Sequence, residues 1–196
     1  MSSKGDTLTT AYFYPCDYSG NPYNEMLTKN MLPVVESFTK KGDTEIERTK
    51  TEYIKSSSRT NNLILPDKTK KSYTGQANLQ TEISFDLYDN KGNIRQYTTA
   101  DGVATSILWY NNFFPTAEIK NAAYEQVKNM FLQNLRTLLP HALVTTYTYQ
   151  PLVGMTSKTD PRGVTTYYEY DDFGRLKRVK LGTAVLEEYD YHYKNQ

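Results

Sequence analysis

Polar and apolar residues alternate along most of this chain, and that alternation predicts β-strands. Short runs rich in Gly, Asp, Asn and Pro separate the strands and favour turns. Residues 79–88 and 94–99 flank one such run, while residues 34–39 and 44–55 flank another at residues 40–43. We therefore expect a mainly β fold of antiparallel β-hairpins in a twisted sheet.

One segment, residues 117–139, departs from this pattern because its apolar residues recur at intervals of three and four. That spacing marks one face of an amphipathic helix. We expect one long helix that is packed on the sheet, buries Val127, Phe131 and Leu135, and ends at Pro140. The face as a whole comprises Ile119, Ala123, Val127, Met130, Phe131, Leu135 and Leu138.

The expected helix sets the domain organisation. It divides the chain into a β-rich N-terminal part at residues 1–116, the helix at 117–140, and a C-terminal part at 141–196. Within the N-terminal part, we expect a short strand at residues 63–65 that Pro66 stops, followed by a polar loop.

The C-terminal part contains an internal repeat with a period of 21 residues. Pairs of tyrosines mark it: Tyr147 and Tyr149, Tyr168 and Tyr170, Tyr189 and Tyr191, with Tyr193 following the last pair. A fixed period of this kind indicates stacked supersecondary units that cannot each bury an apolar face alone. We therefore expect tandem repeats of about 21 residues whose tyrosines form columns.

Each repeat has recognisable turns. Asp171 and Gly174 bound one turn, and Asp160, Pro161 and Gly163 form a second with proline at its second corner. The N-terminal part has a degenerate copy, in which Asp89 and Gly92 match Asp171 and Gly174. The same turn chemistry is thus expected on both sides of the helix.

The unit Tyr-x-Tyr-Asp-x-x-Gly-x-Leu, followed by Asp-Pro-x-Gly and the next Tyr-x-Tyr, resembles the YD (Rhs) repeat. Residues 144–193 look like the repeat region of large YD-repeat surface proteins of the Bacteroidetes type. The resemblance implies a bacterial, secreted or cell-surface parent protein in which β-ribbons form a shell. About three repeats are too few to close a shell, so we interpret the chain as a fragment or a shortened orphan of one.

Composition limits the alternatives. The 23 Lys and Arg nearly balance the 22 Asp and Glu, which argues against nucleic acid as a partner. No apolar run approaches the ~20 residues of a membrane span. The chain begins without the apolar segment of a signal peptide, and its single cysteine, Cys16, excludes an internal disulfide.

Candidate chemistry is sparse. Cys16 with His141 or His192 offers a nucleophile and a base, but nothing around the cysteine indicates an activated thiolate. The run 89–93 resembles a calcium loop without its downstream glutamate. The carboxylates of a glycosidase would have to come from Glu169, Asp171, Asp172, Glu187, Glu188 and Asp190. We expect no catalytic residue, no cofactor and no metal.

The sequence supports three candidate functions, which we rank in order of preference. The first is a non-catalytic structural scaffold acting through β-strand stacking. The second is a carbohydrate-binding surface module that uses the tyrosine faces, and the third is a glycoside-acting enzyme. The strand at residues 187–193 has no cap, so we expect its edge to pair with neighbouring repeats of a longer chain or with a second copy. The alternative is that the N-terminal strand near Tyr12 to Tyr14 covers this edge.

Overall fold

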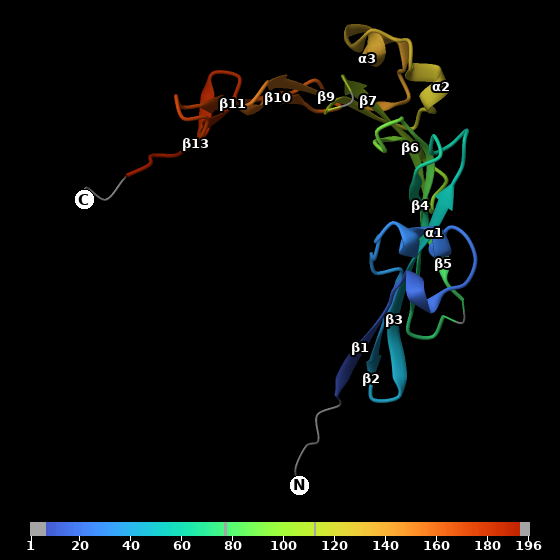
Figure 1. Cartoon of the computed structure of the whole chain (residues 1–196). Coiled ribbons are helices and arrows are strands. Elements are labelled where there is room, and N and C mark those ends of the chain that lie inside the picture. Colours follow the sequence, from blue (N-terminus) through green and yellow to red (C-terminus); the bar gives the residue numbers. More distant parts are fainter. Residues whose placement is uncertain (1–6, 77, 112, 193–196) are drawn as a thin grey trace. The chain divides into compact units, whose positions relative to one another are not determined.

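The computed structural model describes residues 7–192, apart from residues 77 and 112. The fold is mainly β (Figure 1). Within the described residues, thirteen strands lie in the sheet in the order in which they occur in the chain. Their pairings are antiparallel. The predicted fold class of antiparallel hairpins in a twisted sheet is therefore confirmed.

The chain divides into two compact units, Met1–Ala104 and Thr105–Gln196. The first unit has a 3-10 turn η1 (Pro15–Asp17), a short helix α1 (Tyr23–Thr28) and six strands. These strands are β1 (Leu8–Phe13), β2 (Glu36–Lys41), β3 (Thr44–Lys55), β4 (Ile64–Tyr73), β5 (Gln80–Tyr88) and β6 (Ile94–Thr99).

The second unit follows the same hairpin plan with one insertion. Its described strands are β7 (Ala104–Tyr110), β8 (Phe114–Lys120), β9 (Leu143–Gln150), β10 (Gly154–Thr159), β11 (Thr165–Tyr170), β12 (Leu176–Leu181) and β13 (Ala184–Glu188). Between β8 and β9 lie α2 (Tyr124–Val127), η2 (Leu132–Asn134) and α3 (Leu135–Leu138). We call residues 121–142 the insertion.

Charged side chains pair across the strands of the first unit, where few aliphatic residues are available. Lys70 Nζ on β4 lies 2.7 Å from Glu52 Oε1 on β3. Glu36 on β2 lies 3.1 Å from Arg48 and 3.4 Å from Lys50, both on β3. Opposite charges on neighbouring strands support the ladder, so these polar strands pair without a thick core.

The predicted stop at Pro66 and the polar loop after it are wrong, because β4 continues through Pro66 to Tyr73. Pro66 lies opposite Tyr53, where the register of β3 and β4 shifts between Glu52 and Tyr53. An irregularity of this kind tolerates the missing amide of proline, so the strand passes through it.

The long helix predicted at residues 117–139 is also wrong. Its first part belongs to β8, where Ala117 and Ile119 are buried at alternate positions. Asn121 then takes a left-handed φ of 68°, which is incompatible with a continuing helix. The rest forms two helices of four residues each, and so short a helix depends on tertiary packing.

The insertion closes the core of the second unit. Val127 and Leu135 are buried against Ile119 on β8 and Val144 on β9, and α2 and α3 lie beside β7 in Figure 1. Phe131, which we expected in this core, is instead 73% exposed. The backbone at Phe131 is extended, with ψ at 139°, so the residue leaves the face that Val127 and Leu135 share.

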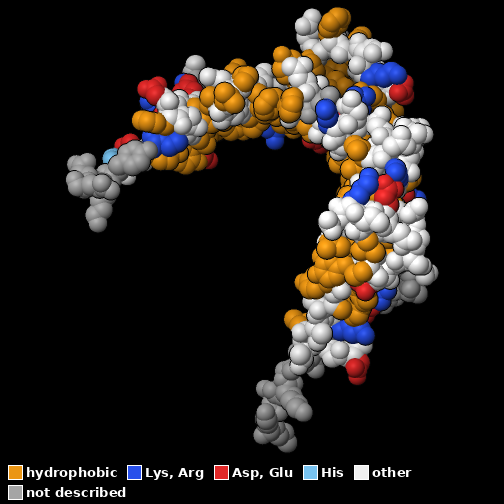
Figure 2. Space-filling model, in the orientation of Figure 1, with side chains coloured by type: hydrophobic (Ala, Val, Ile, Leu, Met, Phe, Trp, Pro, Cys, Tyr) orange, Lys and Arg blue, Asp and Glu red, His pale blue; other side chains and the backbone are white. Residues whose placement is uncertain are grey.

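The division into 1–116, 117–140 and 141–196 stays a prediction, apart from its helical middle segment. Among the described residues, no helix is long and apolar enough to cross a membrane. Hydrophobic side chains reach the surface of both units (Figure 2).

Candidate functional site: the repeat hairpins

Three turns of the chain have the same hydrogen bonds, and each begins with an aspartate. One carboxylate oxygen of Asp89, Asp160 and Asp171 accepts the amides two and four residues further on, at 2.8–2.9 Å. The amide of each aspartate donates to the carbonyl four residues further on at 2.9 Å. The aspartate therefore closes the turn from both its side chain and its backbone.

Glycine follows three residues after each aspartate because the turn requires a positive φ there. The values are 88° at Gly92, 84° at Gly163 and 73° at Gly174. Each of these glycine amides donates to the carbonyl of its aspartate. Pro161 occupies the corner after Asp160, where the turn needs no amide. The spacing of aspartate and glycine is thus fixed by backbone geometry.

Hydrogen bonds hold these carboxyls in the ionised form. The pKa of Asp160 is lowered mainly by the amide of Val164, and that of Asp171 mainly by the side chain of Arg175. Burial of Asp89 raises its pKa, but hydrogen bonds from Asn93 and Lys91 outweigh burial and lower it overall. All three side chains are thus set up as anionic caps of backbone amides.

A fourth turn differs in its first residue. Thr99 donates its amide to Val103 O at 3.2 Å and accepts the amide of Gly102 at 2.9 Å, so it takes the position of aspartate. Asp101, two residues later, accepts the Thr99 hydroxyl at 2.6 Å and the Val103 amide at 3.2 Å. The carboxylate still caps this turn, from a different position in it.

Two repeat tyrosines make the same contact 21 residues apart. The hydroxyl of Tyr170 donates to Met155 O, and that of Tyr191 donates to Leu176 O, both at 2.9 Å. Each phenol therefore ties the end of one strand to the start of the neighbouring strand, 15 positions earlier. We call this contact the tyrosine clamp.

The clamp explains a glycine at the start of β10. A Cβ added to Gly154 would lie 2.7 Å from the hydroxyl oxygen of Tyr170, which real Cβ atoms do not reach. In the next repeat, Arg175 occupies the equivalent position, and its guanidinium lies 4.2 Å from the ring centre of Tyr191. The same pocket for a tyrosine ring is therefore built once with glycine and once with a cation–π contact.

The other predicted tyrosines have separate environments. Tyr147 lies 3.5 Å from Glu118, and the ring of Tyr149 stacks on Phe114 at 5.0 Å. Tyr168 is half-buried, and Tyr189 donates a short hydrogen bond to Glu187. Tyr193 lies outside the described residues. The prediction that these rings form columns stays a prediction.

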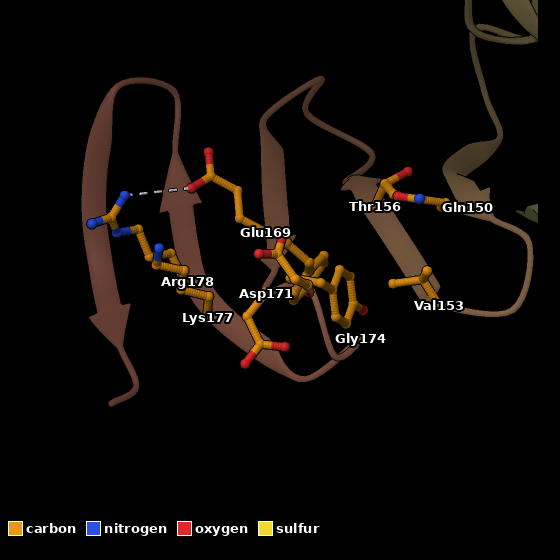
Figure 3. A pocket seen from close by; sticks show the side chains of 11 residues that line it. Gln150, Val153, Thr156, Glu169, Asp171, Gly174, Lys177 and Arg178 are labelled. Carbon is orange, nitrogen blue, oxygen red and sulfur yellow. Dashed lines mark ion pairs between the residues drawn. The ribbon is translucent and has the colours of Figure 1, made fainter. Parts of the chain in front are cut away.

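An open groove of about 630 Å³ separates two successive repeat loops. Tyr168, Glu169 and Asp171 line it together with Lys177 and Arg178. Glu169 points toward Arg178 at 4.0 Å (Figure 3). Charged groups thus gather in the repeat region, and the groove has the polar walls of a candidate ligand site.

The carboxyls of this groove do not have the properties of a glycosidase acid. A general acid needs a raised pKa. The pKa of Glu169 is lowered, chiefly by a 2.6 Å contact with Lys180, and the pKa of Asp171 is lowered as well. Of the other candidates, Glu188 pairs with Arg178 at 2.7 Å and Asp190 with His192 at 3.3 Å. The contacts of Glu169 and Glu188 with lysine and arginine are those of structural ion pairs.

The remaining candidate groups are dispersed. Cys16 is exposed in the first unit, and His141 and His192 are exposed in the second. Asp89 lies in the sequence that resembles a calcium loop, but both of its carboxylate oxygens accept hydrogen bonds from amides. Among the residues that the structure describes, no group of three or more His, Cys, Asp or Glu could hold a metal ion.

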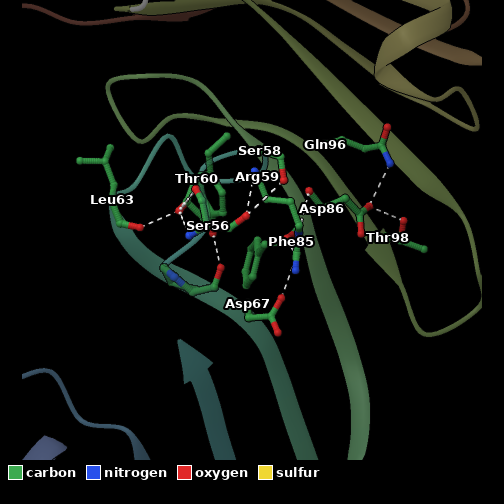
Figure 4. Close-up of polar contacts among 12 residues, drawn as sticks. Ser56, Ser58, Arg59, Thr60, Leu63, Asp67, Phe85, Asp86, Gln96 and Thr98 are labelled. Atoms are coloured by element: carbon green, nitrogen blue, oxygen red, sulfur yellow. Dashed lines mark hydrogen bonds and ion pairs between the residues drawn. The ribbon is translucent and has the colours of Figure 1, made fainter. Parts of the chain in front are cut away.

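Sequence reasoning missed a polar network around Arg59 in the first unit. Its guanidinium donates to Asp67 Oδ1 and Phe85 O, both at 2.6 Å, and to Asp86 O at 3.2 Å (Figure 4). The carboxylate of Asp86 in turn accepts the Thr98 hydroxyl at 2.6 Å. The network fastens the loop between β3 and β4 to β5. Its partners lie 8 to 27 residues from Arg59, beyond the reach of local patterns.

These hairpins define a β-repeat segment, and one comparison, with protein-family models, agrees. The family model described as RHS Repeat matches residues 153–184, which run from the loop before β10 into the first residue of β13. This part of the chain therefore carries an Rhs-type repeat. No curated protein matches the sequence.

Solved structures with a similar fold belong to Tc toxins. The Tc holotoxin pore of Photorhabdus luminescens superposes with a TM-score of 0.45 at 11% identity, over 82% of this chain and 9% of that chain. The TcdB2-TccC3 complex gives a TM-score of 0.44 at 11% identity, over 80% of this chain and 9% of that chain. The chain spans about a tenth of the length of these relatives.

Proposed function

We propose that this chain is a non-catalytic structural segment of an exported Rhs-type repeat protein, and that it acts by stacking β-hairpins. The observation that carries the proposal is the tyrosine clamp, which recurs at Tyr170 and Tyr191 with the same spacing and the same 2.9 Å hydrogen bond. The contact ties neighbouring strands together at the same point of each repeat, as is expected of an array of repeated units. The Rhs repeat at residues 153–184 supports the same conclusion.

The turns support a structural role as well. Asp160 and Asp171 have lowered pKa values because their carboxylates cap backbone amides or pair with arginine. Groups committed in this way stabilise a scaffold and do not transfer protons near neutral pH. We place the parent protein outside the cell or on its surface, where Rhs-type proteins act.

The partner of this segment is a further β-strand. Among the described residues, β13 pairs only with β12. Tyr189 donates its amide to Lys177 O, so the alternation of amides directs those of Glu188 and Asp190 to the opposite edge. That edge can accept a neighbouring repeat of a longer chain or a second copy of this one.

The two partners can be told apart by light scattering over a concentration series. Pairing between copies predicts an apparent mass that rises with concentration. Asp190→Pro should reduce the rise because proline removes a donor from the outer edge only, and Asp190→Ala serves as the control. A chain that stays monomeric at every concentration excludes the second copy and leaves the neighbouring repeat.

The structural function itself is tested by adding a repeat. Replacing residues 192–196 with a second copy of residues 171–192 keeps the 21-residue period. In a stacked array each interface adds stability, so the midpoint of thermal unfolding should rise. A control chain carries the same 22 residues in scrambled order. An unchanged or lower midpoint for the ordered copy would contradict the proposal.

A second candidate function is carbohydrate binding in the groove between the repeat loops. The observation in its favour is that Tyr168 lines the groove beside Glu169, Lys177 and Arg178, and so combines an aromatic ring with polar groups. Titration calorimetry with neutral oligosaccharides would test it. Saturable binding that Tyr168→Ala abolishes would support the sugar site. The absence of any heat of binding would reject it.

A further inference from the structure

The second unit contains a small apolar cavity that the repeat architecture does not require. Its volume is about 240 Å³, and its walls come from β7, β8, β9, the loop after β9 and the insertion. Four of the eight lining residues carry aromatic rings: Tyr110, Phe114, Tyr147 and Tyr149. Repeat contacts alone do not produce this site, because Leu132 of the insertion completes the wall.

The lining of the cavity is uncharged. All eight lining residues are aromatic, aliphatic, threonine or proline. The groove between the repeat loops is different, since Glu169, Asp171, Lys177 and Arg178 line it. The lining offers no charged partner, so an uncharged ligand fits it better than a charged one, whose partial burial among apolar groups would cost free energy.

The aromatic lining and the volume of the cavity favour rings. The rings of Phe114 and Tyr149 stack at a centroid distance of 5.0 Å and an angle of 29°. Burial raises the pKa of Tyr149, which keeps this phenol neutral. Aromatic rings pack well on one another in offset or tilted arrangements. The volume is below the ~300–1,000 Å³ of drug-sized pockets, so one or two fused rings match it.

The threonines of the wall disfavour a sugar as the ligand. The Thr116 hydroxyl already donates to Leu108 O at 3.2 Å. The Thr148 hydroxyl shares hydrogen bonds with Thr156 at 2.8 Å and Ser157 at 2.6 Å. A pyranose would bury several hydroxyls against these occupied groups, and each unsatisfied hydroxyl costs free energy. An aromatic ring has no such requirement.

We propose that this cavity is a binding site for a small uncharged aromatic compound of one or two rings. The ligand packs among Phe114, Tyr147 and Tyr149, and Leu132 closes over it from the insertion. The site goes beyond the proposed scaffold role, since stacking of the repeats does not depend on it. It also gives the insertion between β8 and β9 a function of its own.

Indole is the probe for the test, and ligand-detected NMR on the full chain is the readout. We expect saturable binding with a dissociation constant on the order of 1 mM, as for a fragment of this size. Leu132→Asp places a charge at the wall and should weaken binding at least about tenfold. Leu138→Asp is the matched control, because Leu138 is an exposed leucine of the same insertion that does not line the cavity.

A second variant is needed in case Leu132→Asp loses binding only because it misfolds. Tyr110→Ala removes a wall residue that is largely exposed, so the strand should tolerate it. Loss of binding in both Leu132→Asp and Tyr110→Ala, with retention in Leu138→Asp, supports the site. No saturable binding of indole, equal binding by Leu132→Asp and the parent, or displacement of indole by glucose or N-acetylglucosamine would each overturn it.

Discussion

Asp89→Ala tests the turn chemistry at its most buried point. The Asp89 side chain is 1% exposed, and its oxygens accept the amides of Lys91 and Asn93 and the side-chain amide of Asn93 at 2.8–2.9 Å. Alanine removes both acceptor oxygens and with them all three hydrogen bonds. Loss of a cap costs ~1 kcal/mol, and an unsatisfied buried donor costs ~1–3 kcal/mol.

We therefore expect Asp89→Ala to lower the free energy of unfolding by about 2–3 kcal/mol. For a unit of this size, that corresponds to a fall of roughly 10 °C in the unfolding midpoint. Circular dichroism during heating measures it. Asp89→Asn keeps the acceptor for both backbone amides, so its unfolding midpoint should fall by about half as much as that of Asp89→Ala.

Asp43→Ala is the control, because Asp43 is an exposed aspartate in the turn between β2 and β3. We expect its midpoint to stay within a degree or two of the parent. If Asp89→Ala and Asp43→Ala had the same unfolding midpoint, the argument that Asp89 closes the turn would be refuted.

Three further predictions concern other parts of the chain. Leu135→Ala should cost ~2–5 kcal/mol because Leu135 is fully buried, whereas Phe131→Ala should change stability by no more than ~0.5 kcal/mol; urea unfolding compares them. Arg59→Met should cost ~1–3 kcal/mol and speed hydrogen exchange in residues 56–63, since it leaves two carbonyls and a carboxylate without their donor. Carboxyls whose pKa is lowered in the folded state stabilise it fully above their unfolded value of 3.8, and this stability is lost as the pH falls through the folded pKa. Urea midpoints should thus drop below about pH 4, and less steeply when asparagine replaces the aspartates with lowered pKa values, Asp89, Asp160 and Asp171; equal slopes would contradict the assignment.

The repeat turns could be predicted from the local sequence alone. The spacing of Asp171 and Gly174 is set within four residues, and the hydrogen bonds that enforce it are equally local. The degenerate copy at Asp89 and Gly92 was recognisable for the same reason. A pattern can be recognised from sequence when its physical cause lies within one turn.

Long-range contacts were beyond the sequence. The spacing of Ile119, Val127 and Leu135 predicted one helix, yet Ile119 belongs to a strand and the other two to separate short helices that share its core. Because these three residues are buried in the same core, their spacing in the sequence matches that of a helix although no continuous helix forms. The aromatic cavity was missed likewise, since Leu132 and Tyr149 meet only after the insertion folds back on β9.

Hydrogen exchange along β13 tests the central claim, that successive repeats stack through their strand edges while a tyrosine clamp holds the strands of each repeat together. The measurement compares the parent with the chain in which a second copy of residues 171–192 replaces residues 192–196. We predict that the amides of Glu188 and Asp190 become strongly protected in the extended chain and that Tyr191→Phe reduces this protection. Exchange at these amides as fast as in the parent would show that the added repeat does not stack, and would contradict the account.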